Sequence, residues 1–214
     1  MTDIDVIFFD VDGTLVDSRK DIVKAMNYTL RKLGVKERPE GEVVSYIGTG
    51  VKDLVKKSLG SETAELADEA FKIFSEYYSA HAIDESKLYP HVKETLEHFK
   101  AKRKFVLTNR YKKFADITLR GLGIRNYFEE ILGGDDENCL KPSACILDGF
   151  FKKLKINKVK AMMVGDMTID IMTGKNSDIK TCWVTYGLGK AEDVIPMKPD
   201  YIVDDIIKLK DIIM

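Results

Sequence analysis

The chain has 214 residues, of which 44% are hydrophobic and 32% charged, as expected for one globular core with room for a small insert. The formal net charge of −1 gives no overall field that would favour nucleic acid or an anionic membrane as a partner. No stretch approaches the roughly 18 apolar residues that a membrane span needs. The acidic start, MTDIDVIFFDVDGT, lacks the pattern of a secretory signal.

The three cysteines, Cys139, Cys145 and Cys182, give no sign of a stabilising framework. Their number is odd and no C-x-x-C pair occurs, so the sequence predicts neither a disulfide framework nor a zinc ribbon. Cysteines used in this way are typical of a reducing compartment. We therefore expect a cytoplasmic protein.

The predicted elements form two groups along the chain. The apolar run 6–9 fits a buried parallel strand, and three stripes of apolar residues at helical spacing follow between residues 16 and 85, with no convincing strand. Strands and helices then alternate, with strands predicted at 105–107, 130–132, 161–164, 181–184 and 201–203.

This order predicts an α/β fold with a Rossmann-like parallel sheet, helices on both faces and a small α-helical cap inserted after the first strand. The expected boundaries are 1–15 and 86–214 for the catalytic core and 16–85 for the cap. In such sheets ligands bind at the carboxyl ends of the strands.

Polar side chains collect at these strand ends. Asp10 and Asp12 follow the first strand, Thr108 and Asn109 follow a second, and Asp166 follows a third. Asp170 comes four residues after Asp166, and Lys141 lies in a loop before a helix. Because the ends of parallel strands converge on one edge, we expect all these side chains around one pocket.

The residue types in this pocket suit phosphoryl transfer with magnesium. Crowded carboxylates repel one another, and a hard cation with oxygen ligands removes the conflict; Mg²⁺ takes one or two carboxylates together with a substrate phosphate. A lysine and a threonine hydroxyl would hold the remaining phosphate oxygens. On residue types alone, the attacking group is either a carboxylate or a water molecule.

Four short motifs resemble those of the haloacid dehalogenase-like hydrolases. They are, in chain order, Asp10-Val11-Asp12-Gly13-Thr14, Thr108-Asn109, Lys141-Pro142 and Gly165-Asp166-Met167-Thr168-Ile169-Asp170. Their order and spacing match the family from residue 4 to about residue 205. Each motif falls at a predicted strand end or in the expected loop.

The resemblance implies a role for each position. Asp10 is expected to be the nucleophile and a magnesium ligand, and Asp12 the acid–base residue, with its backbone carbonyl on the metal. Thr108 and the backbone around Asn109 are expected to bind phosphate. Lys141 is expected to pair with the nucleophile and the phosphate. Two further aspartates are expected at the metal: Asp166 as a ligand and Asp170 in support of its shell.

The helical insert resembles the cap of one large branch of the family, which closes over the pocket and selects the substrate. Within that branch the segments 46–50, 88–90 and 184–187 most resemble phosphoglycolate phosphatases. We expect the loop of Gly48, Thr49 and Gly50, together with Lys52, to face the non-phosphate end of the substrate. Arg110, after Thr108-Asn109, stands where the family commonly has lysine.

The resulting prediction is a magnesium-dependent phosphatase that acts on a small-molecule phosphate ester, as a monomer or homodimer. One alternative is a sugar-phosphate mutase of the β-phosphoglucomutase type, which shares the core and differs in the cap. A second alternative, a phospho-receiver domain that does not turn over, would be shorter and would need no helical insert.

Overall fold

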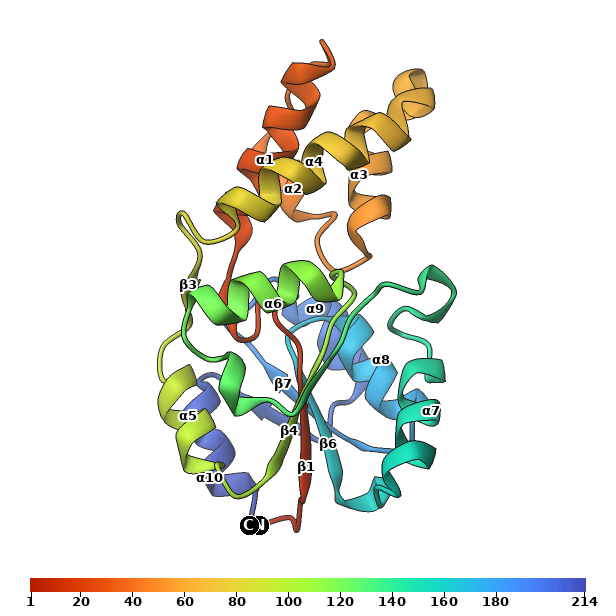
Figure 1. Cartoon of the computed structure of the whole chain (residues 1–214). Helices are drawn as coiled ribbons and strands as arrows, with labels where there is room; N and C mark the ends of the chain where they lie inside the picture. The colour runs from red at the N-terminus through yellow and green to blue at the C-terminus, as the bar shows by residue number, and fades with distance from the viewer.

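A six-stranded sheet forms the centre of the structure, which is a computed structural model describing residues 1–214 (Figure 1). The strand order is β5-β4-β1-β6-β7-β8, and every neighbouring pair is parallel. All carboxyl ends therefore lie along one edge. The strands are β1 (Val6–Phe9), β4 (Arg103–Leu107), β5 (Glu130–Leu132), β6 (Ala161–Gly165), β7 (Lys180–Val184) and β8 (Tyr201–Val203).

The central strand β1 is buried on both faces, which explains its uninterrupted apolar sequence. Ile7 and Phe9 pack into the core on one face, and Val6 and Phe8 pack into the core on the other. β1 pairs with β4 on one side and β6 on the other. The residues that follow these three strands are therefore neighbours.

Helices cover both faces of the sheet (Figure 1). Apolar side chains of α5, α6 and α10 share a core with Ile7 and Phe9, whereas α7 packs against Phe8 on the opposite face and α8 lies beside β6 and β7. α9 follows β7 and contacts α8. The bounds are α5 (Val92–His98), α6 (Lys112–Gly121), α7 (Cys145–Leu154), α8 (Thr168–Asn176), α9 (Ala191–Val194) and α10 (Leu209–Ile212).

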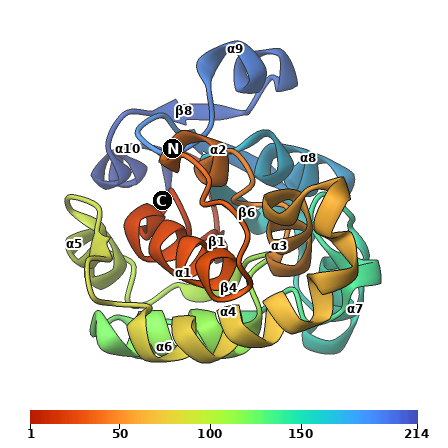
Figure 2. The same cartoon turned by 90° about the horizontal axis from the view of Figure 1, so that it is seen from above.

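Four helices inserted after β1 form a cap with its own apolar core, which includes Met26, Leu30, Val55 and Phe74. Seen from above, the cap helices lie over β1, β4 and β6 (Figure 2). This arrangement confirms the predicted fold class. The cap helices are α1 (Arg19–Lys32), α2 (Glu40–Val44), α3 (Val51–Leu59) and α4 (Ala67–His81).

The connection between cap and sheet differs from the sequence-based expectation. Residues 16–85 were expected to contain no strand, but β2 (Val16–Asp17) pairs antiparallel with β3 (Lys87–Leu88). A two-residue strand leaves no periodic signal, because alternation needs a longer run to be visible. The two chain crossings into the cap are therefore hydrogen-bonded to each other.

The expectation that the cysteines form no disulfide was wrong. The sulfurs of Cys139 and Cys145 are bonded, with their Cα atoms 5.7 Å apart, while Cys182 is a free thiol buried in β7. Cys139 ends a short 3-10 helix, Glu137–Cys139, and Cys145 begins α7, so the disulfide links the two ends of the intervening loop across a spacing of six residues. Counting cysteines cannot reveal this geometry. None of the helices combines the length and the hydrophobicity that a membrane-spanning segment requires.

Candidate active site

Three buried carboxylates meet at the carboxyl edge of the sheet. Asp10 directly follows β1, Asp166 directly follows β6, and Asp170 lies in the first turn of α8. One carboxylate oxygen from each lies within 4.8 Å of those of the other two. All donors are hard oxygens, as Mg²⁺ prefers, and Lys141 forms ion pairs with Asp10 and Asp170 but not with Asp166. This donor set fits a divalent cation.

The electrostatics of the cluster show the repulsion that a cation would relieve. Burial raises the pKa of Asp10 to about 7, and the nearby charges of Asp170 and Asp12 act in the same direction, partly opposed by Lys141. Burial also raises the pKa of Asp166 well above its usual range, with further contributions from Asp170 and Asp10. The site therefore holds its negative charge at a cost in free energy when no cation is bound.

The turn after β1 brings the chain close enough to orient Asp166. Gly13 has φ +90°, and a Cβ atom built there would lie 2.3 Å from Oδ2 of Asp166, so only glycine fits. The next residue, Thr14, donates its hydroxyl proton to Oδ1 of Asp166 at 2.8 Å. The backbone N–H of Leu188 donates to Oδ2 at 2.6 Å. Both carboxylate oxygens of Asp166 are thus held in place.

Lys141 connects the loop after β5 to this cluster. Its ammonium group donates to Oδ1 of Asp10 at 2.7 Å and to Oδ1 of Asp170 at 2.6 Å, and its side chain is 2% exposed. Burial alone would lower the pKa of Lys141, but the charges of Asp10 and Asp170 outweigh this effect and raise it above its usual range. Lys141 is therefore a permanent cation beside Asp10.

A cavity under the cap is lined by Asp10, Asp12 and Lys141 and by the two residues that follow β4, Thr108 and Asn109. Thr108 and Asn109 are both buried, but their hydrogen bonds differ. Oδ1 of Asn109 accepts a hydrogen bond from the backbone N–H of Lys141 at 2.7 Å. Nδ2 of Asn109 donates to the carbonyl oxygens of Lys141 at 3.0 Å and Gly48 at 2.9 Å. Its side chain thus fixes the lysine loop and one cap residue. The Thr108 hydroxyl accepts the backbone N–H of Arg110 at 3.2 Å and retains its own proton for a ligand.

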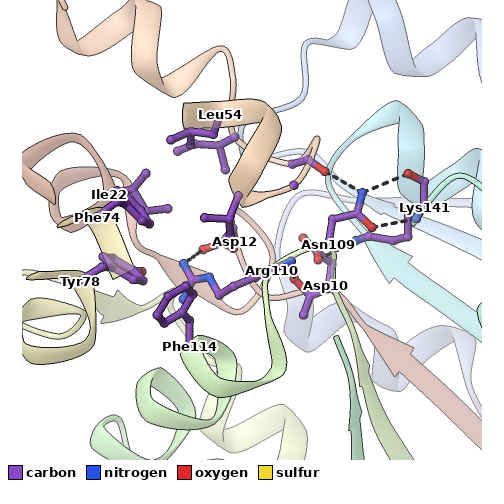
Figure 3. A pocket seen from close by; sticks show the side chains of 15 residues that line it. Asp10, Asp12, Ile22, Leu54, Phe74, Tyr78, Asn109, Arg110, Phe114 and Lys141 are labelled. Carbon is purple, nitrogen blue, oxygen red and sulfur yellow. Dashed lines mark hydrogen bonds and ion pairs between the residues drawn. The ribbon is translucent and has the colours of Figure 1, made fainter. Parts of the chain in front are cut away.

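Asp12 points away from the carboxylate cluster. Its Oδ1 accepts hydrogen bonds from the Ser18 hydroxyl and from Nη2 of Arg110, and its side chain is 11% exposed. Figure 3 shows Asp12 and Arg110 on the cap side of Asp10. Two residues that follow the same strand therefore present their carboxylates to different partners, one to Lys141 and one to Arg110.

The cap contributes only part of the predicted loop to this cavity. Gly48 and Gly50 line it, next to Val51 and Leu54, whereas Thr49 and Lys52 line a separate depression. The ammonium group of Lys52 forms an ion pair with Glu137 at 2.5 Å and lies over the Phe71 ring. The structure therefore brings the two glycines to the candidate site and directs the lysine elsewhere, because Lys52 follows Gly50 by two residues, about half a helical turn.

Three groups that contact the site residues were not predicted from the sequence. Arg110 was noted only as a departure from the family pattern, and Ser18 was not considered. The N–H of Leu188 was missed as well, because no side chain marks it. A signal for Arg110 did exist: an arginine directly after a strand-end polar pair lies at the same sheet edge as the carboxylates.

Comparison with known proteins agrees with the geometry. The model of the haloacid dehalogenase-like hydrolases matches residues 7–184. The chain is 33% identical over 221 residues to a phosphoglycolate phosphatase of Vibrio vulnificus (99% of this chain, 97% of the relative). It is 35% identical over 208 residues to one of Aquifex aeolicus, with 96% of each chain covered.

A solved structure extends this likeness to three dimensions. The crystal structure of a predicted phosphoglycolate phosphatase from Haemophilus somnus 129PT superposes with a TM-score of 0.90 at 30% identity, covering 99% of each chain. The matched family model includes both strand-end aspartate pairs, the Thr-Asn pair and the buried lysine within its span. By sequence, by fold and by the contents of its sheet edge, this chain belongs to the haloacid dehalogenase-like hydrolase family.

Proposed function

We propose that this protein hydrolyses a small phosphate monoester, phosphoglycolate or a close analogue, through a phosphorylated aspartate at Asp10. The observation that carries the proposal is the position of Asp10: it directly follows the central strand, contacts Lys141 at 2.7 Å and lies in a cavity under the cap. The names of relatives that match over nearly the full chain support phosphoglycolate as the substrate.

In the first half-reaction, a carboxylate oxygen of Asp10 attacks phosphorus in line with the ester oxygen. The P–O ester bond breaks, and the leaving oxygen takes a proton from Asp12. Lys141 and the Thr108 hydroxyl bind the phosphate oxygens, where negative charge accumulates. The products of this step are the free alcohol and an acyl phosphate on Asp10.

In the second half-reaction, water attacks the same phosphorus and gives a proton back to Asp12. The bond between phosphorus and the Asp10 oxygen breaks, releasing inorganic phosphate and restoring the carboxylate. Asp10, Asp166 and the backbone carbonyl of Asp12 are the groups that would hold Mg²⁺, with Asp170 in support. The ion would supply charge neutralisation for the phosphate.

We further propose that residues 1–15 and 86–214 act as the catalytic core and residues 16–85 as a substrate-selecting cap. Each part has an apolar core of its own, and the cavity lies between them with lining residues from both. Water exclusion by the cap would protect the acyl phosphate until the alcohol has left.

The test is phosphate release from phosphoglycolate by the intact protein with Mg²⁺, compared with excess EDTA and with EDTA followed by added Mg²⁺. We expect activity, loss of activity and recovery, in that order. Acid quenching with ³²P-labelled substrate should leave label on the wild-type protein that hydroxylamine removes, and none on Asp10→Asn. Full turnover by Asp10→Asn would refute the mechanism, and conversion of β-glucose 1-phosphate to glucose 6-phosphate would indicate a mutase.

A further inference from the structure

The cavity extends past Asp12, away from the carboxylate cluster, into a mostly apolar chamber under the cap. Its walls there come from Ile22 and Leu54 of the cap and from Phe114 of the core (Figure 3). Only two cationic side chains line the whole cavity, Lys141 at the phosphate end and Arg110 at this far end. A cavity with a cation at each end is suited to a substrate with two anionic groups.

Arg110 has N–H donors in this cavity that make no hydrogen bond within the protein. Its residue exposure is 6%, Nη1 donates to the Thr118 hydroxyl at 2.9 Å, and Nη2 donates to Asp12. Nε makes no hydrogen bond, and each Nη has a second N–H that makes none. These N–H groups can donate charge-assisted hydrogen bonds to the oxygen atoms of a ligand, which are stronger than hydrogen bonds between neutral groups. The planar guanidinium matches a carboxylate in a two-point contact.

A second polar group lies beside it. The guanidinium of Arg110 lies over the Tyr78 ring, 5.3 Å from its centroid, and the buried Tyr78 hydroxyl in the same wall lies near the Thr118 hydroxyl but makes no hydrogen bond of good geometry. Figure 3 shows both side chains at the same end of the cavity. A phenol that donates next to a guanidinium again favours an acceptor with negative charge.

We propose that Arg110, assisted by the Tyr78 hydroxyl, binds the carboxylate of a substrate in which this group is one carbon from the ester oxygen. The inference rests on the proposed function, because Asp12 marks where the leaving oxygen must lie. The carbon attached to that oxygen then enters the apolar chamber, and a carboxylate on that carbon reaches Arg110, which contacts Asp12 directly. Lys141 thus binds the phosphate of this substrate, and Arg110 binds its carboxylate.

The test compares phosphoglycolate with ethyl phosphate, in which a methyl group replaces the carboxylate. The quantity measured is the ratio of kcat/KM for the two substrates, because Arg110 also contacts Asp12 and its loss lowers both activities. We expect Arg110→Gln to reduce this ratio about 10- to 100-fold, mainly through a higher KM for phosphoglycolate. Arg110→Lys should fall between, because it keeps the charge but loses the planar fork.

Two further variants separate binding from folding. Tyr78→Phe leaves the guanidinium charge in place and should reduce the ratio about 3- to 10-fold. Arg120→Gln removes an exposed arginine that pairs with Asp116 on α6 and should leave the ratio unchanged.

Equal losses on both substrates in Arg110→Gln and Arg110→Lys, with the ratio preserved, would mean that Arg110 acts only on Asp12, and would overturn the inference while leaving the proposed function intact. A wild-type protein that shows no preference for phosphoglycolate would overturn the proposed substrate, and this inference with it.

Discussion

Replacing Asp10 with asparagine should stabilise the metal-free protein while abolishing its turnover. Asn has nearly the shape of a protonated aspartate but carries no charge at any pH. In the wild type, the folded-state pKa of Asp10 is about 7, against 3.8 for the free side chain. The folded protein therefore binds a proton here more tightly than the unfolded chain does, and its stability falls as the pH rises between these two values.

The size of the effect follows from these two values. Ionised Asp10 destabilises the folded state by about 4 kcal/mol at pH 8 and about 2 kcal/mol at pH 5, and the cost disappears below about pH 4. Asp10→Asn escapes this cost. We expect its free energy of unfolding in EDTA to exceed that of the wild type by several kcal/mol at pH 8 and by less at pH 5. Added Mg²⁺ should narrow the gap by stabilising the wild type.

The assay is urea unfolding in EDTA at several pH values, followed by the fluorescence of Trp183. This is the only tryptophan, it is 3% exposed, and its Nε1 donates to the backbone oxygen of Asp166 at 2.9 Å, so it reports on the site. Asp211→Asn, an exposed position, serves as the control and should change little. An Asp10→Asn protein no more stable than the wild type at pH 8, or a difference that does not shrink towards pH 5, would refute the electrostatic account.

Three further outcomes follow from contacts in and around the site. Lys141→Met should reduce kcat by more than about 100-fold, as measured by phosphate release. It should also destabilise the metal-free protein at pH 8 by about 3–5 kcal/mol, because it leaves buried carboxylates without their cation. Unchanged stability in urea unfolding would contradict this account. Cys139→Ser should lower the free energy of unfolding by about 2 kcal/mol relative to the oxidised wild type, a modest effect because the loop closed by the disulfide is short. Under reducing conditions the two proteins should have the same stability, because the wild type then has no disulfide. Lys52→Ala should change KM for phosphoglycolate less than twofold, because its ammonium group contacts Glu137 outside the cavity; a tenfold rise would return Lys52 to the substrate site.

The sheet and the positions of the site residues were accessible from sequence for one physical reason. Parallel strands buried on both faces are short apolar runs, and each ends abruptly where polar residues begin. The steps from Phe9 to Asp10 and from Gly165 to Asp166 therefore show where a strand ends and also where a site residue lies. Placing these ends on one edge needs only the parallel topology. The structure accordingly brings Asp10, Asp166 and Asp170 together.

Side-chain directions could not be predicted in the same way. Asp10 and Asp12 look equivalent in sequence, yet one carboxylate pairs with Lys141 and the other with Arg110. The backbone around Asn109 was expected to bind phosphate, which stays a prediction, but the sequence did not show that the Asn109 side chain holds the backbone of Lys141 and Gly48. These outcomes depend on contacts between segments 32 to 131 residues apart, for which local patterns carry no information.

The paired strands at the base of the cap limit how it can move. Val16 pairs with Leu88 and Asp17 with Lys87, so the two crossings form one ribbon that acts as a hinge with a preferred axis. On the far side of the cap, opening would break the hydrogen bond from Asn109 to Gly48 and the exposed Lys52–Glu137 pair, and exposed pairs of this kind are worth about 0–1 kcal/mol. It would also separate the aromatic rings of Phe74 on α4 and Phe114 on α6, which are in contact. Product release can therefore proceed by a swing of the whole cap about one edge, and the main packing that such a swing must undo is the aromatic contact between α4 and α6.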